Sequence, residues 1–275
     1  MSTGTAAPPA QSPAPAKRAT FGNVLSSEWT KIMTVKSTFW TMIAAVIVTI
    51  GLSLLLALAF TSAWDQMKPA DRAQFDPASF GLVGINFGMV AFGVLGVLVI
   101  TGEYATGMIR TALTAMPRRM EYLTAKVLVL GLITLVVGQI VAFASFLLSQ
   151  LIFKSKDINA SLGDDGVLRA VIGGGLYLAL IAVIALGIGV LLRHTAGSVT
   201  TILGVLFVLP IIGSFLPGDW GRTVSKFLPS NAGGAIMTAR PLDDMLSPWA
   251  GFGVFLLYTA IVLVAAFAVF QKRDA

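Results

Sequence analysis

The sequence predicts an all-α membrane protein with six transmembrane helices. Composition, segment length and the placement of charges support this fold class. Of the 275 residues, 56% are hydrophobic and only 12% are charged. About a quarter of the residues of a soluble domain are charged, because its surface must be hydrated. The chain has no cysteine, which excludes disulfides, thiolate metal sites and cysteine nucleophiles.

Six apolar segments without Asp, Glu, Lys or Arg follow one another along the chain. Each is long enough for the ~20 residues that a helix needs to cross ~30 Å of hydrocarbon. We expect them to form one transmembrane domain over residues 38–271. The predicted spans are 39–60, 80–100, 127–153, 170–192, 196–216 and 249–270.

The boundary between the fourth and fifth spans is the shortest. Only Arg193, His194 and Thr195 separate them, which allows a tight helical hairpin. Gly197 and Pro210 make the fifth span the one most prone to a kink.

The residues before the first span divide into a tail and a helix. Residues 1–20 are rich in Pro, Ala, Ser and Thr, a composition that cannot bury a core and predicts a disordered tail. In residues 21–37 the apolar positions recur with a helical period, which predicts an amphipathic helix lying on the membrane surface. Packing of this helix on a protein core is the alternative. The interfacial residues would be Phe21, Leu25, Glu28, Trp29, Lys31 and Ile32.

Basic residues beside the spans indicate the orientation. Lys36, Arg193 and Lys272 each lie within a few residues of a span. Lys and Arg near span ends favour the cytoplasmic side, so we expect both termini, including a tail at 272–275, in the cytoplasm. The net charge of +6 then reflects contact with lipid headgroups rather than with nucleic acid.

No pattern for catalysis or for nucleotide binding is present in the sequence. The single histidine, His194, is expected to be an ordinary surface residue, and no phosphate-binding G-x-x-x-x-G-K-[ST] motif occurs. We therefore expect no enzyme activity and no bound cofactor or metal. Ion-coupled transporters usually hold ionisable residues at mid-membrane, and their absence from the six segments disfavours a secondary transporter.

Glycines inside the spans indicate close helix packing. Gly84 and Gly88 form a G-x-x-x-G pair in the second span, and small residues let helices approach closely in lipid. Packing within the chain is one interpretation. A dimer face or a sliding surface is the other.

The stretch between the second and third spans, residues 101–119, is expected to carry a second amphipathic helix over 103–116, which Pro117 ends. Glu103 would lie in its first turn, where the helix dipole favours an anion. Glu103 and Arg110 are expected to be exposed and dispensable for folding. Such a helix suits docking onto a cytoplasmic partner, and a solvated linker is the alternative.

Three passages carry a resemblance to a known family. They are Ser-Glu-Trp-Thr-Lys-Ile at 27–32, residues 101–119, and Phe-Leu-Pro-Ser-Asn-Ala at 227–232. In this order, and with six spans, the chain resembles the membrane subunits of ABC exporters of the type-2 permease family. The fused ATPase domain of some relatives is not found in the sequence, so their substrates do not transfer.

The resemblance implies a coupling helix at 103–116 that docks into a cytoplasmic ATPase. The turn at Arg193 and His194 would add a second, smaller contact, and residues 217–248 would form short re-entrant or surface helices outside. The candidate coupling residues are Glu103, Tyr104, Thr106, Gly107, Met108, Arg110, Arg118 and Arg119.

The function implied is that of a permease subunit of an ATP-driven exporter in the plasma membrane. A second permease, either a copy or a paralogue, would complete the path, and separate ATPase subunits would bind ATP and Mg. Membrane lipids are expected partners and nucleic acid is not. The alternatives are a non-transport scaffold or sensor subunit and, with less support, a secondary transporter.

Overall fold

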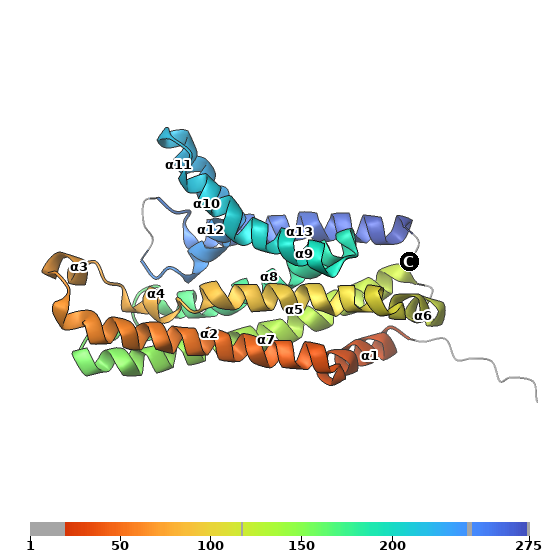
Figure 1. The fold of residues 1–275 in the computed structure, drawn as a ribbon, viewed down its shortest axis with the longest axis horizontal. Coiled ribbons are helices and arrows are strands. Elements are labelled where there is room, and N and C mark those ends of the chain that lie inside the picture. The colour runs from red at the N-terminus through yellow and green to blue at the C-terminus, as the bar shows by residue number, and fades with distance from the viewer. Residues whose placement is uncertain (1–19, 117, 241–243, 274–275) are drawn as a thin grey trace, which may run out of the picture.

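The computed structural model describes residues 20–116, 118–240 and 244–273, and within these ranges the regular structure is entirely helical. Six of its helical segments are long and apolar enough to cross a membrane, which confirms the predicted all-α polytopic fold. They run side by side along the long axis of the molecule (Figure 1). The segments are Lys36–Gln66, Pro77–Thr106, Arg119–Lys156, Val167–Leu192, Thr195–Ser214 and Pro248–Lys272.

Within these segments the individual helices are α2 (Lys36–Ala63), η1 (Trp64–Gln66), α4 (Pro77–Gly81), α5 (Ile85–Thr106), α7 (Arg119–Phe153), η2 (Lys154–Lys156), α8 (Val167–Leu192), α9 (Thr195–Leu203), the π-helical η3 (Gly204–Val208), α10 (Leu209–Ser214) and α13 (Pro248–Lys272). Short helices complete the chain: α1 (Phe21–Thr34), α3 (Pro69–Ala73), α6 (Met108–Ala115), α11 (Gly218–Phe227), α12 (Pro229–Gly234) and η4 (Ala235–Met237). The predicted tail at 1–20, except Thr20, and residues 274–275 lie outside the described residues.

Helix α8 lies at the centre of the bundle and packs against α5, α7 and α13. After Arg169 in its first turn, α8 carries no charged residue and is apolar on all sides, as expected of a helix surrounded by other helices. Its close approach to α5 depends on Gly96, because a Cβ there would lie 2.1 Å from the carbonyl oxygen of Ala182. By contrast, α2, α9, α10 and α13 leave most of their surface uncovered.

The G-x-x-x-G pair of the second span packs within the chain. A Cβ at Gly84 would lie 2.2 Å from Ser53 Oγ, and one at Gly88 would lie 2.1 Å from Thr49 Oγ1. Both partners are on α2, so the interpretation as packing within the chain accounts for this motif.

The fifth membrane-crossing segment is irregular at its centre. Five residues of π-helix, Gly204–Val208, end two residues before Pro210. Proline has no N–H to donate to the carbonyl four residues earlier, and its ring crowds that turn; a wider turn relieves this strain. Pro210 therefore causes the irregularity. Gly197 lies in the regular first turn of α9, where its N–H is bonded to His194 Nδ1.

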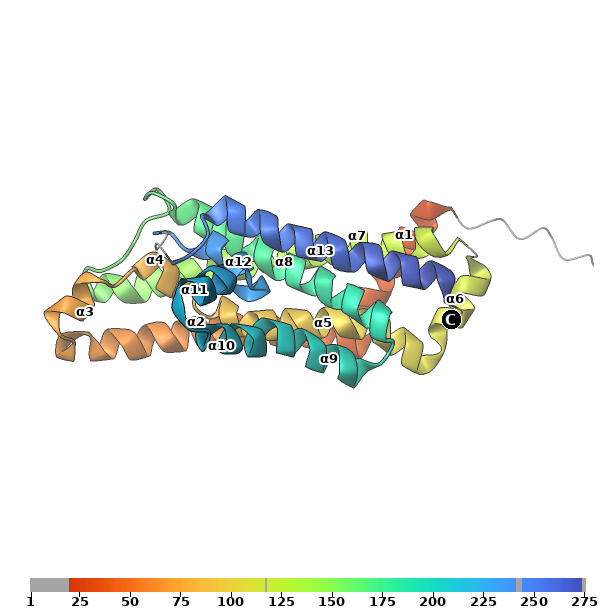
Figure 2. The same cartoon turned by 90° about the horizontal axis from the view of Figure 1, so that it is seen from above.

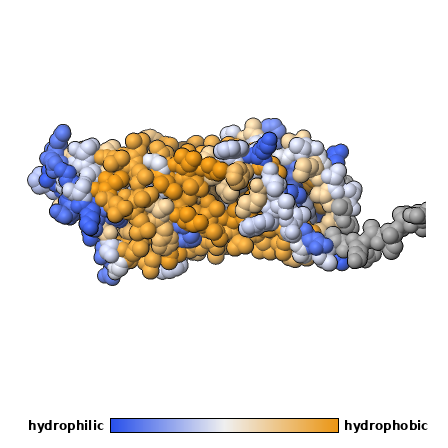
Figure 3. All heavy atoms as spheres, turned by 90° about the horizontal axis from the view of Figure 1, so that it is seen from below, coloured by the Kyte–Doolittle hydropathy of each residue, from blue (hydrophilic) through white to orange (hydrophobic). Residues whose placement is uncertain are grey.

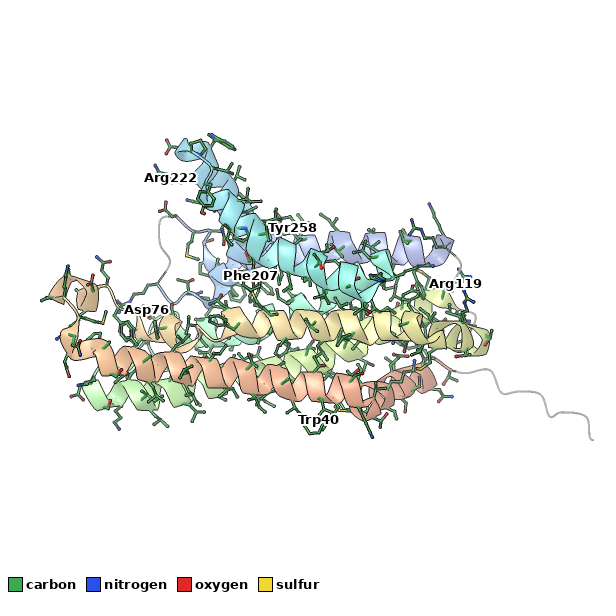
Figure 4. The ribbon with its side chains drawn as sticks, viewed as in Figure 1. Trp40, Asp76, Arg119, Phe207, Arg222 and Tyr258 are labelled. Atoms are coloured by element: carbon green, nitrogen blue, oxygen red, sulfur yellow. The ribbon has the colours of Figure 1, made fainter. Side chains whose placement is uncertain are left out.

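The bundle has two polar ends separated by an apolar band (Figure 3). One end, here named the α6 end, gathers α1, α6, the turn between α8 and α9, and the last turn of α13; α3 lies at the opposite end (Figures 1 and 2). Between them the apolar side chains of the outer helices point outward, as Trp40 does from α2 (Figure 4).

The segment between the fifth and sixth spans contains short helices of two kinds. Helix α11 projects from the bundle (Figure 1) and exposes Trp220. Helices α12 and η4 are instead buried against α8 and α13. A Cβ at Gly233 would meet the rings of Tyr177 and Phe255 at 2.4 and 2.9 Å, so α12 fits only because a glycine stands there.

Candidate functional site: a ring of four charges beside helix α6

Helix α1 packs on the protein with one face and exposes the other. Its N-terminus is capped by Thr20, whose hydroxyl accepts from the N–H of Asn23. Val24, Glu28 and Ile32, spaced four residues apart, form the buried face against α7. Trp29 is 46% exposed on the other side. Glu28 and Ile32, both predicted to be interfacial residues, are buried in protein, so on this face the alternative of packing on a protein core holds.

Glu28 and Lys31 of α1 meet Glu103 of α5 and Lys126 of α7 in a closed ring of alternating charges. Lys126 Nζ lies 2.5 Å from Glu28 Oε2 and 2.9 Å from Glu103 Oε1. Lys31 Nζ lies 2.5 Å from Glu28 Oε1 and 2.9 Å from Glu103 Oε1. We call these four residues the charged ring.

The charged ring is shielded from solvent on all but one side. Glu28 is fully buried, Lys126 is 1% exposed, and the Lys31 side chain is the most open member. Buried charges are tolerated when they are paired and hydrogen-bonded, and two carboxylates with two ammonium groups leave the ring neutral.

Tyr122 of α7 completes the coordination of the ring. Its hydroxyl donates to Glu103 Oε2. The ammonium nitrogens of Lys31 and Lys126 each lie 5.3 Å from the centre of the Tyr122 aromatic ring. At this range a cation is attracted to the electron-rich face of the tyrosine.

The surroundings keep Lys31 charged. Partial burial would lower the pKa of Lys31, but its hydrogen bond to Glu28 and the negative charges of Glu103 and Glu28 outweigh this and raise the pKa above the ordinary value. Lys31 therefore remains an ammonium at neutral pH.

The sequence prediction for Glu103 is wrong in position and exposure. Glu103 lies in the last turn of α5, not in the first turn of a helix at 103–116, and it is buried. Helix α5 ends at Gly107, which adopts a left-handed conformation with φ of 70°. Glycine adopts this conformation without steric cost, so the chain turns sharply and a separate helix begins at Met108.

Helix α6 is short and amphipathic. Ile109 is buried, and Ala112 and Leu113 are half-buried, all within or against the apolar cluster that includes Val24 of α1. Met108, one of the candidate coupling residues, is 41% exposed. The outer face presents Arg110, Thr111 and Thr114.

The remaining candidate residues lie around this helix at the α6 end. The guanidinium group of Arg193 lies 5.3 Å from the centre of the Tyr104 ring. Arg119, labelled in Figure 4, donates to the carbonyl of Arg273 at 3.0 Å, and Arg193 donates to the same oxygen at 3.4 Å. The turn after α8, the start of α7 and the end of α13 are thus tied together.

Other candidates make local contacts. His194 is exposed and caps α9, its Nδ1 accepting from the N–H of Gly197 at 3.2 Å, as expected of a surface histidine. Arg118 pairs with Glu121 at 2.8 Å. Phe21 is exposed, and Leu25 packs partly against the apolar cluster under α1.

Two hollows adjoin the charged ring. A cavity of about 170 Å³ is lined by all four ring residues and by Val35, Leu98 and Thr106, among others. A groove of about 360 Å³ runs between α1 and α6, with Asn23 and Ser27 on one side and Thr111 on the other.

A family model described as ABC-2 family transporter protein matches residues 24–212. The chain belongs to the ABC-2 transporter family. The matched stretch begins in α1 and ends in α10, so it contains the charged ring, Tyr122 and the whole of α6. None of the curated proteins compared with the chain is detectably similar to it.

Two ring-associated residues of this ABC-2 transporter protein were not singled out from its sequence. Neither Lys126 nor Tyr122 is among the residues that the sequence predicts for the site. Both lie on α7 one helical turn apart, so they share a face. The four-residue spacing of Tyr122 and Lys126, and the position of Lys126 directly before an apolar run, are the features of the sequence that point to these two residues. The partners of Lys126 come from distant parts of the chain and were not predictable locally.

The residues of this ABC-2 transporter site form ion pairs that hold helices together. Among the described residues, no three His, Asp or Glu side chains gather as metal ligands would. The acids that do meet, Glu28 and Glu103, are each bonded to both lysines. The arrangement joins helices.

Proposed function

We propose that this chain is the permease subunit of an ATP-driven exporter and couples through α6 to a separate cytoplasmic ATPase. The ATPase would bind ATP and Mg, and a second permease, a copy or a paralogue, would complete the substrate path. ATP-driven closure of the ATPase subunits would press on α6 and switch the path from inward-facing to outward-facing. The membership of the chain in the ABC-2 transporter family supports this division of labour.

The observation that carries the proposal is the construction of α6. It joins two membrane-crossing helices, α5 and α7, and lies at the end of the bundle (Figure 1). One face packs on the apolar cluster that also holds α1, and the other presents Arg110, Thr111 and Thr114. A force on that outer face would pass directly into α5 and α7.

The distribution of charge supports a cytoplasmic location for the α6 end and for both termini. Basic residues clearly outnumber acidic ones there, whereas the described loops at the opposite end hold similar numbers of both. Lys and Arg near span ends favour the cytoplasmic side. The basic residues at the α6 end are Lys31, Lys36, Arg110, Arg118, Arg119, Lys126, Arg193, Lys272 and Arg273.

The uncovered surfaces of α2, α9, α10 and α13 support the pairing with a second permease within the plasma membrane. Exposed apolar side chains such as Ile47, Ile211 and Val264 line these helices. Part of this surface would face lipid, and part would meet the second permease around a shared path.

The test is a charge reversal on the outer face of α6. Arg110→Glu should leave membrane insertion and folding unchanged, since the residue is exposed. It should release the ATPase or uncouple its hydrolysis, because loss of a charge at a packed interface costs ~2–5 kcal/mol of binding. The measurements are expression, co-purification of the ATPase and ATP hydrolysis by the reconstituted complex.

Arg222→Glu on α11 is the matched control. It is also an exposed arginine on a short helix, but α11 lies away from the α6 end, so ATPase binding and hydrolysis should stay at wild-type levels. Wild-type ATPase binding and coupled hydrolysis in Arg110→Glu would contradict the role of α6 and favour a scaffold or sensor subunit.

A further inference from the structure

Helix α1 is attached to the bundle mainly by side chains. Its only direct chain connection to a membrane-crossing helix is at Val35, where α2 follows. Elsewhere it is held by the burial of Val24 and Ile32 and by the charged ring. The ring is therefore the polar part of the α1 attachment.

The geometry of the ring fixes α1 in more than one direction. Glu28 Oε1 and Oε2 bond to different lysines, one on α1 itself and one on α7. Both lysines also bond to Glu103 of α5. A slide of α1 by one residue, ~1.5 Å along its axis, would stretch contacts to α5 and α7 at once. Apolar contacts such as those of Val24 and Ile32 have no such directional requirement.

The ring also lies next to the connection through which α6 is attached. Glu103 is four residues before Gly107, where α5 ends and α6 begins. Tyr122, which bonds Glu103, lies in the first turns of α7, just after α6. Helix α1 thus contacts α5 and α7 close to the ends that flank α6.

We propose that Lys126 is a positioning residue that locks α1 to α5 and α7, so that α1 moves with α6 as one rigid unit. The joint movement of α1 and α6 during transport rests on the proposed function. The attachment of α1 to α5 and α7 through Lys126 does not, because it depends on this chain alone. On this view α1 is a moving part of the transporter and not only a membrane anchor.

The lock is tested with a variant that keeps the ring neutral. Glu28→Gln with Lys126→Met removes one charge of each sign and leaves the pair formed by Lys31 and Glu103. Because no uncompensated charge remains, the double variant should fold. Asp65→Asn with Lys156→Met removes an exposed cross-segment pair at the other end of the bundle and is the matched control.

The absence of native cysteine allows spin labels to be attached at chosen sites. Cysteines at Ser26 of α1 and Leu128 of α7, both exposed, report the distance between these helices by pulsed electron resonance. The labelled chain is placed in lipid nanodiscs and diluted with excess unlabelled chain, so that pairs between two copies do not contribute.

We expect a narrow distance distribution in the wild-type chain and in the control. The Glu28→Gln, Lys126→Met variant should give a clearly broader one, while its amount in the membrane and its elution profile match the wild type. Lys126→Arg keeps the charge and has the adjoining cavity for its larger group, so it should stay narrow. An equally narrow distribution in the neutral double variant would overturn the proposal, since apolar packing alone would then fix α1.

If the neutral double variant does not fold, the wild-type complex with its ATPase still tests whether α1 and α6 move together. Labels at Ser26 and Thr114 should keep their distance when the complex is trapped with Mg-ATP and vanadate, whereas labels at Ser26 and Thr201 of α9 should change theirs. A change between Ser26 and Thr114 would overturn the lock alone. Failure of any ATPase to associate with the wild-type chain would overturn the proposed function and leave the nanodisc result standing.

Discussion

Lys126 on α7 donates to Glu28 on α1, a residue 98 positions earlier in the chain, with 2.5 Å between Nζ and Oε2. Both side chains are buried. This single contact joins a surface helix to a membrane-crossing helix.

Removing one member of the charged ring should be costly for folding. Lys126→Met leaves Glu28 and Glu103 with only Lys31 between them, and breaking a buried ion pair from one side costs ~3–5 kcal/mol. We expect a lower yield of folded protein and a lower midpoint in thermal unfolding followed by tryptophan fluorescence. Lys156→Met breaks an exposed pair with Asp65, worth ~0–1 kcal/mol, and serves as control. Equal stability of the two variants would contradict the buried ring.

The contribution of Lys31 to the free energy of unfolding should not depend on pH near neutrality. Because its pKa is higher in the folded protein than the ordinary 10.5, its stabilising effect is complete below that value and is lost as pH rises through the folded-state pKa. The difference in stability between wild type and Lys31→Met should therefore be constant between about pH 6 and 9. A difference that shrinks within this range would show that Lys31 loses its proton near neutral pH.

Gly96 should tolerate no side chain. A Cβ there would lie 2.1 Å from the backbone oxygen of Ala182, and overpacking of this kind costs ~1–3 kcal/mol or more. Gly96→Ala should reduce the fraction of chain that elutes as a single species from size-exclusion chromatography. Gly51→Ala, with no atom within 4 Å of the added methyl group, should behave like the wild type. Normal elution of Gly96→Ala would mean that α5 and α8 pack less closely than the structure shows.

Cysteine labelling should place α6 inside the cell. On the cysteine-free background, Thr114→Cys on the exposed face of α6 should react with a membrane-impermeant thiol reagent only after permeabilisation. Ser161→Cys, exposed in the loop before α8, should react in intact cells. The reverse pattern would invert the orientation and remove α6 from the reach of a cytoplasmic ATPase.

The six-span fold was predictable because each span is a local property of the chain. A stretch such as 170–192 is apolar at every position, and in hydrocarbon the backbone must satisfy its own hydrogen bonds, which favours a helix whatever its neighbours are. The disturbance at Pro210 was likewise local, since it follows from the missing N–H of proline. The spacing of Gly84 and Gly88 indicated close packing but not whether the partner would be α2 or a second chain.

The site was only partly predictable, because its essential contacts are not local. Glu28, Glu103 and Lys126 each stand in a stretch that also suits an exposed helix end, and periodicity places Glu103 in one continuous helix with Met108. The left-handed turn at Gly107 separates them, and the packing of α1 on α7 then buries Glu28 opposite Lys126. A buried charge is costly unless an opposite charge or hydrogen bonds compensate it, and which charges meet depends on how the helices pack together.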